Sequence, residues 1–399
     1  MTLLRRLLLL SLLALGAFLA LRGSQDPAVE HDGGTSAETP DSARPILLEK
    51  RPVAPPDLSA SPAGLETPIG GAGEWIQLNN EATLRLGEGE LAQAVEMLER
   101  CVAGDPDGEI FRRNLAEALV RLSREDYEVR RLEQAIGNLE RAVELAPDRE
   151  DAQVLRDLAR RWGREREVEE NHWTEDSDLF ELSYDTDRSD ILQQSQSVLD
   201  HLERAYERLF GWFGADPVRG MRRAPIRVVL YRRAEFGHLT GLGDWAGGAF
   251  DGVVRVAVED LVAEEARWRR VLTHELVHVF VHELGGTDVP GWLNEGLAQL
   301  LETADPSDSV RAADQRLGDT PLFALDRLQG SLAAWSDPTE IGRAYAQSLL
   351  LVERIRREYG DEALRHMVLG CAEGRTPESS FLSWTRVPLT FVIELLGTR

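Results

Sequence analysis

The sequence predicts an α+β fold for its C-terminal part, preceded by an all-α module of helical repeats. Two observations carry this prediction. Strand patterns occur between residues 169 and 258 and give way to helical patterns up to the C-terminus. Before residue 169, small and large apolar residues recur at a fixed helical spacing. The chain of 399 residues, 43% hydrophobic and 29% charged, is long enough for two or three domains.

The expected elements of the C-terminal part are short strands followed by helices. Strands are expected at 172–184, 226–231 and 247–258. Helices are expected at 190–213, 261–284, 293–301, 345–359, 362–369 and 391–396.

Acidic residues dominate the charge of the chain. Sixty-nine acidic side chains against 45 basic ones give a formal net charge of −24. A nucleic-acid binder presents a basic surface to the phosphate backbone, so nucleic acid is not an expected partner. Cys101 and Cys371 are the only cysteines, which excludes a disulfide framework and a cysteine-type zinc site.

The first 23 residues have the pattern of an export segment. Arg5 and Arg6 precede an uncharged run, residues 7–21, in which Leu and Ala dominate. The run is shorter than the roughly 20 residues of a comfortable membrane span, and no good small-residue cleavage site follows it. Residues 1–23 are therefore expected to be a signal peptide or an N-terminal membrane anchor. Either places the protein outside the cytoplasm, periplasmic or secreted, with a tether to the inner membrane as one possibility.

Residues 24–74 are expected to be a disordered linker. They are rich in Pro, Gly, Ser, Ala and Glu, and no apolar periodicity runs through them.

Residues 75–168 contain an internal repeat. The order of small, large and small apolar residues before a proline in 91–106 recurs in 132–147. This spacing resembles the second helix of tetratricopeptide repeats, with an ordinary helical bundle as the alternative. The second unit carries about seven extra residues, expected in the turn around 123–131. A helix at 151–162 is expected to cap the stack, and the module is expected to bind a protein partner or a substrate.

A metal-binding pattern lies in the helix expected at 261–284. His274 and His278 stand one helical turn apart, so both imidazoles can reach one ion. Glu275 lies beside them and can take a proton from a metal-bound water. The alternative is a core helix whose histidines bond to their neighbours. The surrounding residues are nearly all apolar, which makes an unpartnered His-Glu-His face costly.

A third ligand is expected from Glu295. Gly285, Gly286 and Pro290 break the chain after the first helix and let a second helix run back antiparallel. Glu295, near the start of that second helix, can reach the same ion. Two His and one Glu leave a fourth position for water, which is the arrangement of a catalytic zinc site.

With both motifs in place, residues 169–399 resemble the gluzincin metallopeptidases, in particular the peptidase-MA-like domains. The resemblance rests on the His274–His278 motif and on the run from Trp292 to Ala298, which is close to the corresponding run of aminopeptidase N relatives. It implies a zincin-like domain with a small mixed sheet, in which His274, His278 and Glu295 hold Zn²⁺. It also implies that Glu275 is the general base.

The resemblance adds one further candidate. Gluzincins often stabilise the oxyanion with a Tyr from a later helix, and Tyr345 opens such a helix here, with Ser348 on the same face. The alternative is that Tyr345 is a packing residue.

Three other residues are candidates for a role near the motifs. His282 stands one turn beyond His278 and is expected to be structural or to support the ligands. His238 is expected in a surface loop. Asp288 is expected either to orient a ligand imidazole or to serve the turn.

The expected function is hydrolysis of peptide bonds in a peptide or protein substrate by a zinc metallopeptidase. Related aminopeptidases hold the free amine of the substrate with a Glu that 247–252 lacks, although Asp251 could replace it imperfectly. Endopeptidase action is therefore expected. The alternative is a non-catalytic, zinc-binding scaffold or assembly protein of the cell envelope.

Overall fold

The computed structural model describes residues 72–217, 225–240, 247–259, 261–332 and 335–397. The expected export segment, residues 1–23, and all but the last three residues of the expected linker lie outside these ranges. The described chain separates into two compact units, and the division falls between Glu170 and Asn171.

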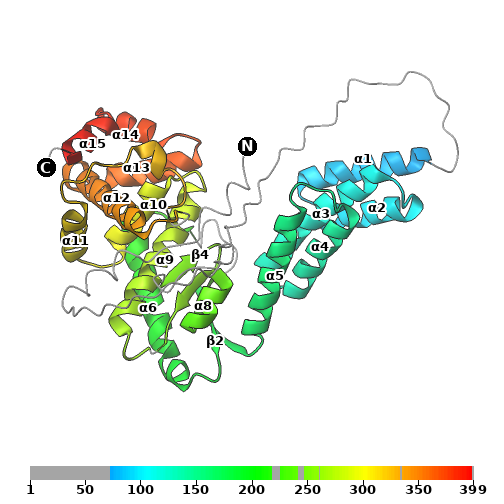
Figure 1. Ribbon diagram of the computed structural model, residues 1–399, viewed down its shortest axis with the longest axis horizontal. Helices are drawn as coiled ribbons and strands as arrows, with labels where there is room; N and C mark the ends of the chain where they lie inside the picture. Colours follow the sequence, from blue (N-terminus) through cyan, green and yellow to red (C-terminus); the bar gives the residue numbers. More distant parts are fainter. Residues whose placement is uncertain (1–71, 218–224, 241–246, 260, 333–334, 398–399) are drawn as a thin grey trace, which may run out of the picture. The chain divides into compact units, whose positions relative to one another are not determined.

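The first unit is a stack of helices, drawn in blue to green in Figure 1. Its described helices are α1 (Ala72–Glu88), α2 (Leu91–Gly104), α3 (Glu109–Glu128), α4 (Leu132–Leu145) and α5 (Ala152–Glu169). Consecutive helices pack against each other, and the shared apolar positions of α2 and α4 are buried. The unit is helical as expected, while its assignment as tetratricopeptide-like stays a prediction.

The extra residues of the second helix pair do not form a long turn. Residues 123–128 continue α3, and only 129–131 connect it to α4. The reason is that Ser123 and Asp126 are buried on α3, where Asp126 accepts hydrogen bonds from Asn138 and Arg131.

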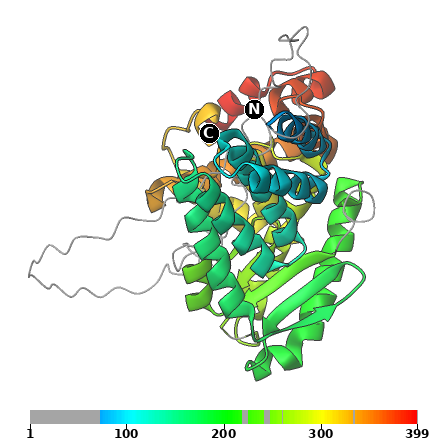
Figure 2. The ribbon, with the colours of Figure 1, turned by 90° about the vertical axis from the view of Figure 1, so that its right-hand side faces the viewer.

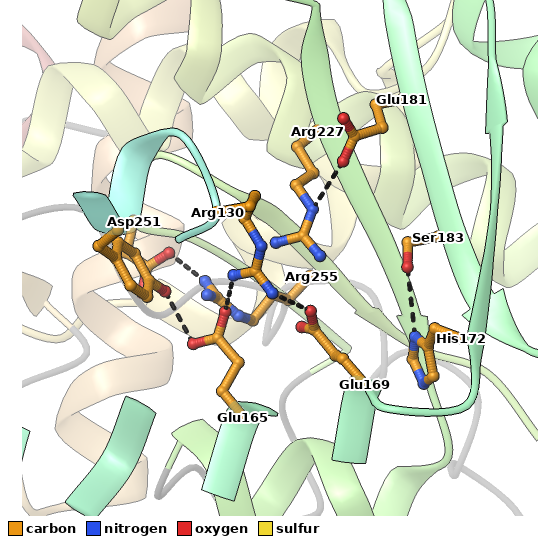
Figure 3. A network of polar contacts seen from close by, with 10 residues as sticks. Arg130, Glu165, Glu169, His172, Glu181, Ser183, Arg227, Asp251 and Arg255 are labelled. Atoms are coloured by element: carbon orange, nitrogen blue, oxygen red, sulfur yellow. Dashed lines mark hydrogen bonds and ion pairs between the residues drawn. The ribbon is translucent and has the colours of Figure 1, made fainter. Parts of the chain in front are cut away.

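A charged cluster holds this connection against α5. Arg130, which has a φ of 62°, donates to Glu165 at 2.6 Å and also pairs with Glu169 (Figure 3). The Tyr127 hydroxyl donates to Glu165 at 2.7 Å, and its ring stacks on Trp162 at 4.4 Å between centroids. A left-handed residue that is not glycine costs energy, and these contacts offset that cost.

The second unit contains one mixed sheet. Its strands are β1 (His172–Asp176), β2 (Phe180–Asp185), β3 (Ile226–Tyr231), β4 (Gly248–Phe250) and β5 (Val254–Ala257). Their order is β1-β2-β3-β5-β4; β2, β3 and β5 are parallel, while β1 and β4 run antiparallel at the two edges. Figure 2 shows the strands side by side in one twisted layer. The predicted α+β fold is confirmed.

Two of the expected strands are hairpins. Residues 172–184 divide into β1 and β2, and residues 247–258 divide into β4 and β5. The second division falls at Asp251 and Gly252, where Gly252 has a φ of +100°. Asp-Gly is a hairpin signal because the turn needs a residue that tolerates positive φ.

The helices of the second unit follow the expected order, with additions. They are α6 (Ser189–Phe213), α8 (Arg233–Thr240), α9 (Glu265–Gly285), α10 (Gly291–Leu301), α11 (Ser307–Leu317), the 3₁₀ helix η2 (Leu325–Leu328), α12 (Pro338–Tyr359), α13 (Asp361–Ala372), α14 (Pro377–Thr385) and α15 (Leu389–Gly397). Helices α8, α11 and α14 were not expected from the sequence.

Helix α9 is the centre of this unit. It packs against β4, β5 and α6, and also against α10 and α13. Residues 271–281 of α9 are all buried, including every apolar side chain between Val271 and Val281. Any polar side chain in this segment must therefore find its partners inside the protein. None of the described helices is both long enough and apolar enough to cross a membrane.

One histidine of the α6–α9 contact predicts acid destabilisation. His201 Nε2 lies 2.8 Å from the Arg269 carbonyl oxygen and 3.0 Å from Thr273 Oγ1. Burial, reinforced by nearby Arg charges, lowers the pKa of His201 to about 4. The unfolded chain binds this proton near pH 6.5, whereas the folded chain does not, so stability is full above that pH and falls below it.

We expect the His201 contribution to decrease by about 2 kcal/mol between pH 7.5 and pH 5. Urea denaturation of His201→Gln should show a smaller loss of stability than the wild type over this interval. The exposed His238→Gln variant is the control and should follow the wild type. Equal pH dependence in all three proteins would contradict the assignment.

Candidate metal centre

Two adjacent helices present the expected ligands. His274, Glu275 and His278 lie on α9, and Glu295 lies on α10; all four side chains are buried. Gly286, with a φ of +72°, ends α9, and Pro290 precedes α10, so the chain reverses over a few residues. The reversal packs α10 against α9.

The three expected ligands converge. His274, His278 and Glu295 each offer one atom, and these atoms lie within 4.8 Å of one another. Glu295 Oε2 is 4.0 Å from His274 Nε2 and 3.9 Å from His278 Nε2. These distances are too long for hydrogen bonds. Among the described residues none bonds to these three atoms, although all three are buried.

The other nitrogen of each imidazole is held by a hydrogen bond. His274 Nδ1 lies 2.8 Å from Glu302 Oε2, and His278 Nδ1 lies 2.8 Å from Asn294 Oδ1. Both oxygens accept, so Nδ1 carries the proton and Nε2 presents its lone pair toward Glu295. Arg270, 4.0 Å from Glu302 Oε1, adds a cation behind this contact.

The two orienting residues were not singled out by sequence reasoning. Asn294 directly precedes Glu295, and Glu302, the residue that follows the end of α10, comes two helical turns after Glu295. That spacing was the available signal for Glu302. Asp288, one of the candidates for this role, does not hold either imidazole: it is exposed and lies in the turn before α10.

The electrostatics of the site favour a cation. Burial raises the pKa of Glu275 well above its usual value, and the charge of Glu302 raises it further. Burial and the charge of Glu275 do the same to the pKa of Glu295. Burial lowers the pKa of His278 to about 3, with a smaller effect from His274. Buried carboxylates and neutral imidazoles whose lone pairs face one point fit a divalent cation.

Glu275 lies beside the ligands, under the edge strand. Both of its carboxylate oxygens are buried, and no described residue bonds to them. A Cβ built on Gly248 of β4 would lie only 2.6 Å from Glu275 Oε1, so the β4 backbone passes directly over the carboxylate. A larger residue at position 248 would displace this side chain.

Tyr345 is buried on α12, which packs against α10. Burial raises its pKa well above the usual value, and the negative charges of Glu295 and Glu275 raise it further. Ser348, by contrast, donates to the Ala344 carbonyl at 2.8 Å and faces Gly296 of α10.

The remaining candidates lie apart from the ligand atoms. His282 contacts the Phe250 ring edge-on, at 6.0 Å between centroids. His238 is exposed on α8, so it belongs to a helix and not to the expected loop. Asp251, the residue considered for binding a substrate amine, pairs with the buried Arg255 (Figure 3). Its carboxylate is therefore already engaged.

Comparison with known proteins covers the same part of the chain. Residues 218–387 match the family model of the Peptidase MA superfamily. The match includes α9, α10 and α12 and therefore every residue of the centre described above. It supports a peptidase-like domain in the second unit. No curated protein matches the chain.

The geometry predicts one bound metal per chain. His274→Ala or Glu295→Ala removes a ligand and should reduce the metal content, measured by elemental analysis, from about one equivalent to background. Glu302→Gln should retain the site but weaken its affinity in chelator competition about 10- to 100-fold. Glu283→Gln, on the same helix but outside the ligand set, is the control. Full metal content in both ligand variants would contradict the assignment.

Proposed function

We propose that this protein is a zinc-dependent metallopeptidase that cleaves internal peptide bonds of proteins or peptides outside the cytoplasm. The observation that carries the proposal is the convergence of His274, His278 and Glu295 beside the unbonded carboxylate of Glu275. The Peptidase MA superfamily match over the same residues supports it.

In this proposal His274, His278 and Glu295 hold the zinc ion. When bound, zinc supplies Lewis-acid polarisation and lowers the pKa of a coordinated water. Two His and one Glu are a ligand set found in catalytic zinc sites, which leave a position open.

Glu275 acts as the general base. Its oxygens have no described partner, so either can accept a proton from the attacking water and later deliver it to the leaving amine.

The position of strand β4 supports an extended peptide as the substrate. It is an edge strand of the sheet and passes over Glu275 at Gly248. An extended peptide can add to such an edge through backbone hydrogen bonds, without requiring a free terminus. Asp251 is paired with Arg255, so its carboxylate is already engaged and is not reserved for a substrate amine. These two features support endopeptidase action.

The rival function is a zinc-binding scaffold. A scaffold needs the ligands but has no use for a buried carboxylate such as Glu275, whose burial is costly. This favours the enzyme.

The first test removes the base and keeps its size. Glu275→Gln should retain zinc and thermal stability but lose at least about 100-fold in the cleavage of an internally quenched peptide library. The matched control, Glu283→Gln, should cleave like the wild type. A wild type that binds zinc and cleaves no member of the library would favour the scaffold. Release of N-terminal residues from short peptides would contradict endopeptidase action.

The second test concerns Tyr345. If its hydroxyl stabilises the oxyanion, Tyr345→Phe should lower kcat by about 100- to 1000-fold, as expected for one fixed donor, with zinc content and melting temperature unchanged. Tyr359→Phe, at the opposite end of the same helix, is the control. An unchanged kcat with a lowered melting temperature would make Tyr345 a packing residue.

A further inference from the structure

The surface of the first unit contains a groove between α4 and α5. It has a volume of about 460 Å³. Its floor consists of four apolar side chains, two from each helix: Leu139, Val143, Leu155 and Ala159. They repeat at a spacing of four residues on both helices, so they form two parallel rows.

The two rims of this groove carry opposite charges. Glu140 and Glu144 line the α4 side, while Arg156 and Arg160 line the α5 side, and all four are exposed. No ion pair between described residues crosses the groove. Arg160 pairs with Asp157 on its own helix, at 2.6 Å. Glu140, Glu144 and Arg156 therefore remain open to a third element, while Arg160 shares its charge with Asp157.

The helix order shows what kind of element fits. In this unit α1 packs with α2, and α3 packs with α4, whereas α5 has only α4 as its main neighbour. In a stack of helix pairs, the partner of α5 would be another helix. Within the described chain of this unit, no helix takes that position.

We propose that the groove binds an amphipathic helix of a partner protein, with a row of apolar residues between one basic and one acidic flank. The apolar row would lie on the floor of the groove. Its Lys or Arg residues would face Glu140 and Glu144, and its Asp or Glu residues would face Arg156 and Arg160. This inference does not depend on the peptidase activity.

Charge complementarity decides the identity of the occupant. A flank of uniform charge meets attraction on one rim and repulsion on the other, whereas flanks of opposite charge meet attraction on both. A helix can enter the groove in either direction. Its direction is decided by which of its flanks is basic, because that flank must face Glu140 and Glu144. Because the rims are exposed, the binding weakens as salt is added.

The test uses three synthetic helical peptides and the full-length chain. The peptides share one Leu/Ala apolar row and differ only in their flanks: one has Lys on one side and Glu on the other, one has Glu on both, and one has Lys on both. In calorimetry at low salt, the mixed peptide should bind at least tenfold more tightly than the other two.

A charge reversal should then exchange the preference. Glu140→Lys combined with Glu144→Lys makes both rims basic, so the variant should lose at least tenfold for the mixed peptide and gain for the all-Glu peptide. The control is Glu96→Lys combined with Glu133→Lys, which changes the net charge equally at exposed positions outside the groove. Circular dichroism checks that both variants stay helical.

Three outcomes would overturn the proposal. The first is equal or absent binding of the three peptides, and the second is the same loss in the control variant. The third is a self-associating chain whose dimer is dissociated by the rim variant, because the occupant would then be a second copy of this protein. Exchange of peptide preference in the rim variant alone would support it.

Discussion

The burial of a charged cluster inside an apolar helix is the constraint on which the second unit depends. Residues 271–281 of α9 are buried, and His274, Glu275 and His278 are among them. Ionisable groups in such surroundings are costly unless each polar atom has a partner. The Nδ1 atoms of His274 and His278 are hydrogen-bonded to Glu302 and Asn294. The inward atoms, the two Nε2 atoms and Glu295 Oε2, face one another at distances that suit no hydrogen bond. The arrangement fits a bound cation, which would join these inward atoms.

The sequence was sufficient to predict that His274, His278 and Glu295 lie together, because their spacing is local. One helical turn joins His274 to His278, and the Gly and Pro residues that reverse the chain before Glu295 are visible in the sequence. The orienting contacts depend on how two helices face each other. Glu302 reaches His274 only because α10 packs along α9, so its spacing from Glu295 indicated its face but not this contact.

One expected element differs from the structure because a local turn signal is stronger than the apolar pattern around it. Asp251-Gly252 divides 247–258 into a hairpin, although the valines that follow suggested one strand. The opposite difference occurs at 123–131, where the extra length relative to a 34-residue repeat suggested a turn. There, Asp126 is buried in α3 and accepts a hydrogen bond from Asn138 of α4, and this tertiary contact outweighs weak local preferences.

Two glycines set how closely the other elements approach the ligands. A Cβ on Gly296 would lie 2.5 Å from the Ser348 carbonyl oxygen and 2.4 Å from Val352 Cγ2, so only glycine lets α12 lie this close to α10. Gly296 directly follows Glu295, and Tyr345 stands one turn before Ser348 on α12, so this contact sets how closely the two helices that carry these residues approach. Gly248 plays the same part on the other side, where β4 passes over Glu275. The positions of Glu275 and of helix α12, which carries Tyr345, therefore depend on the absence of side chains at Gly248 and Gly296. A methyl group at either glycine would displace one of these two candidates without contacting a metal ligand.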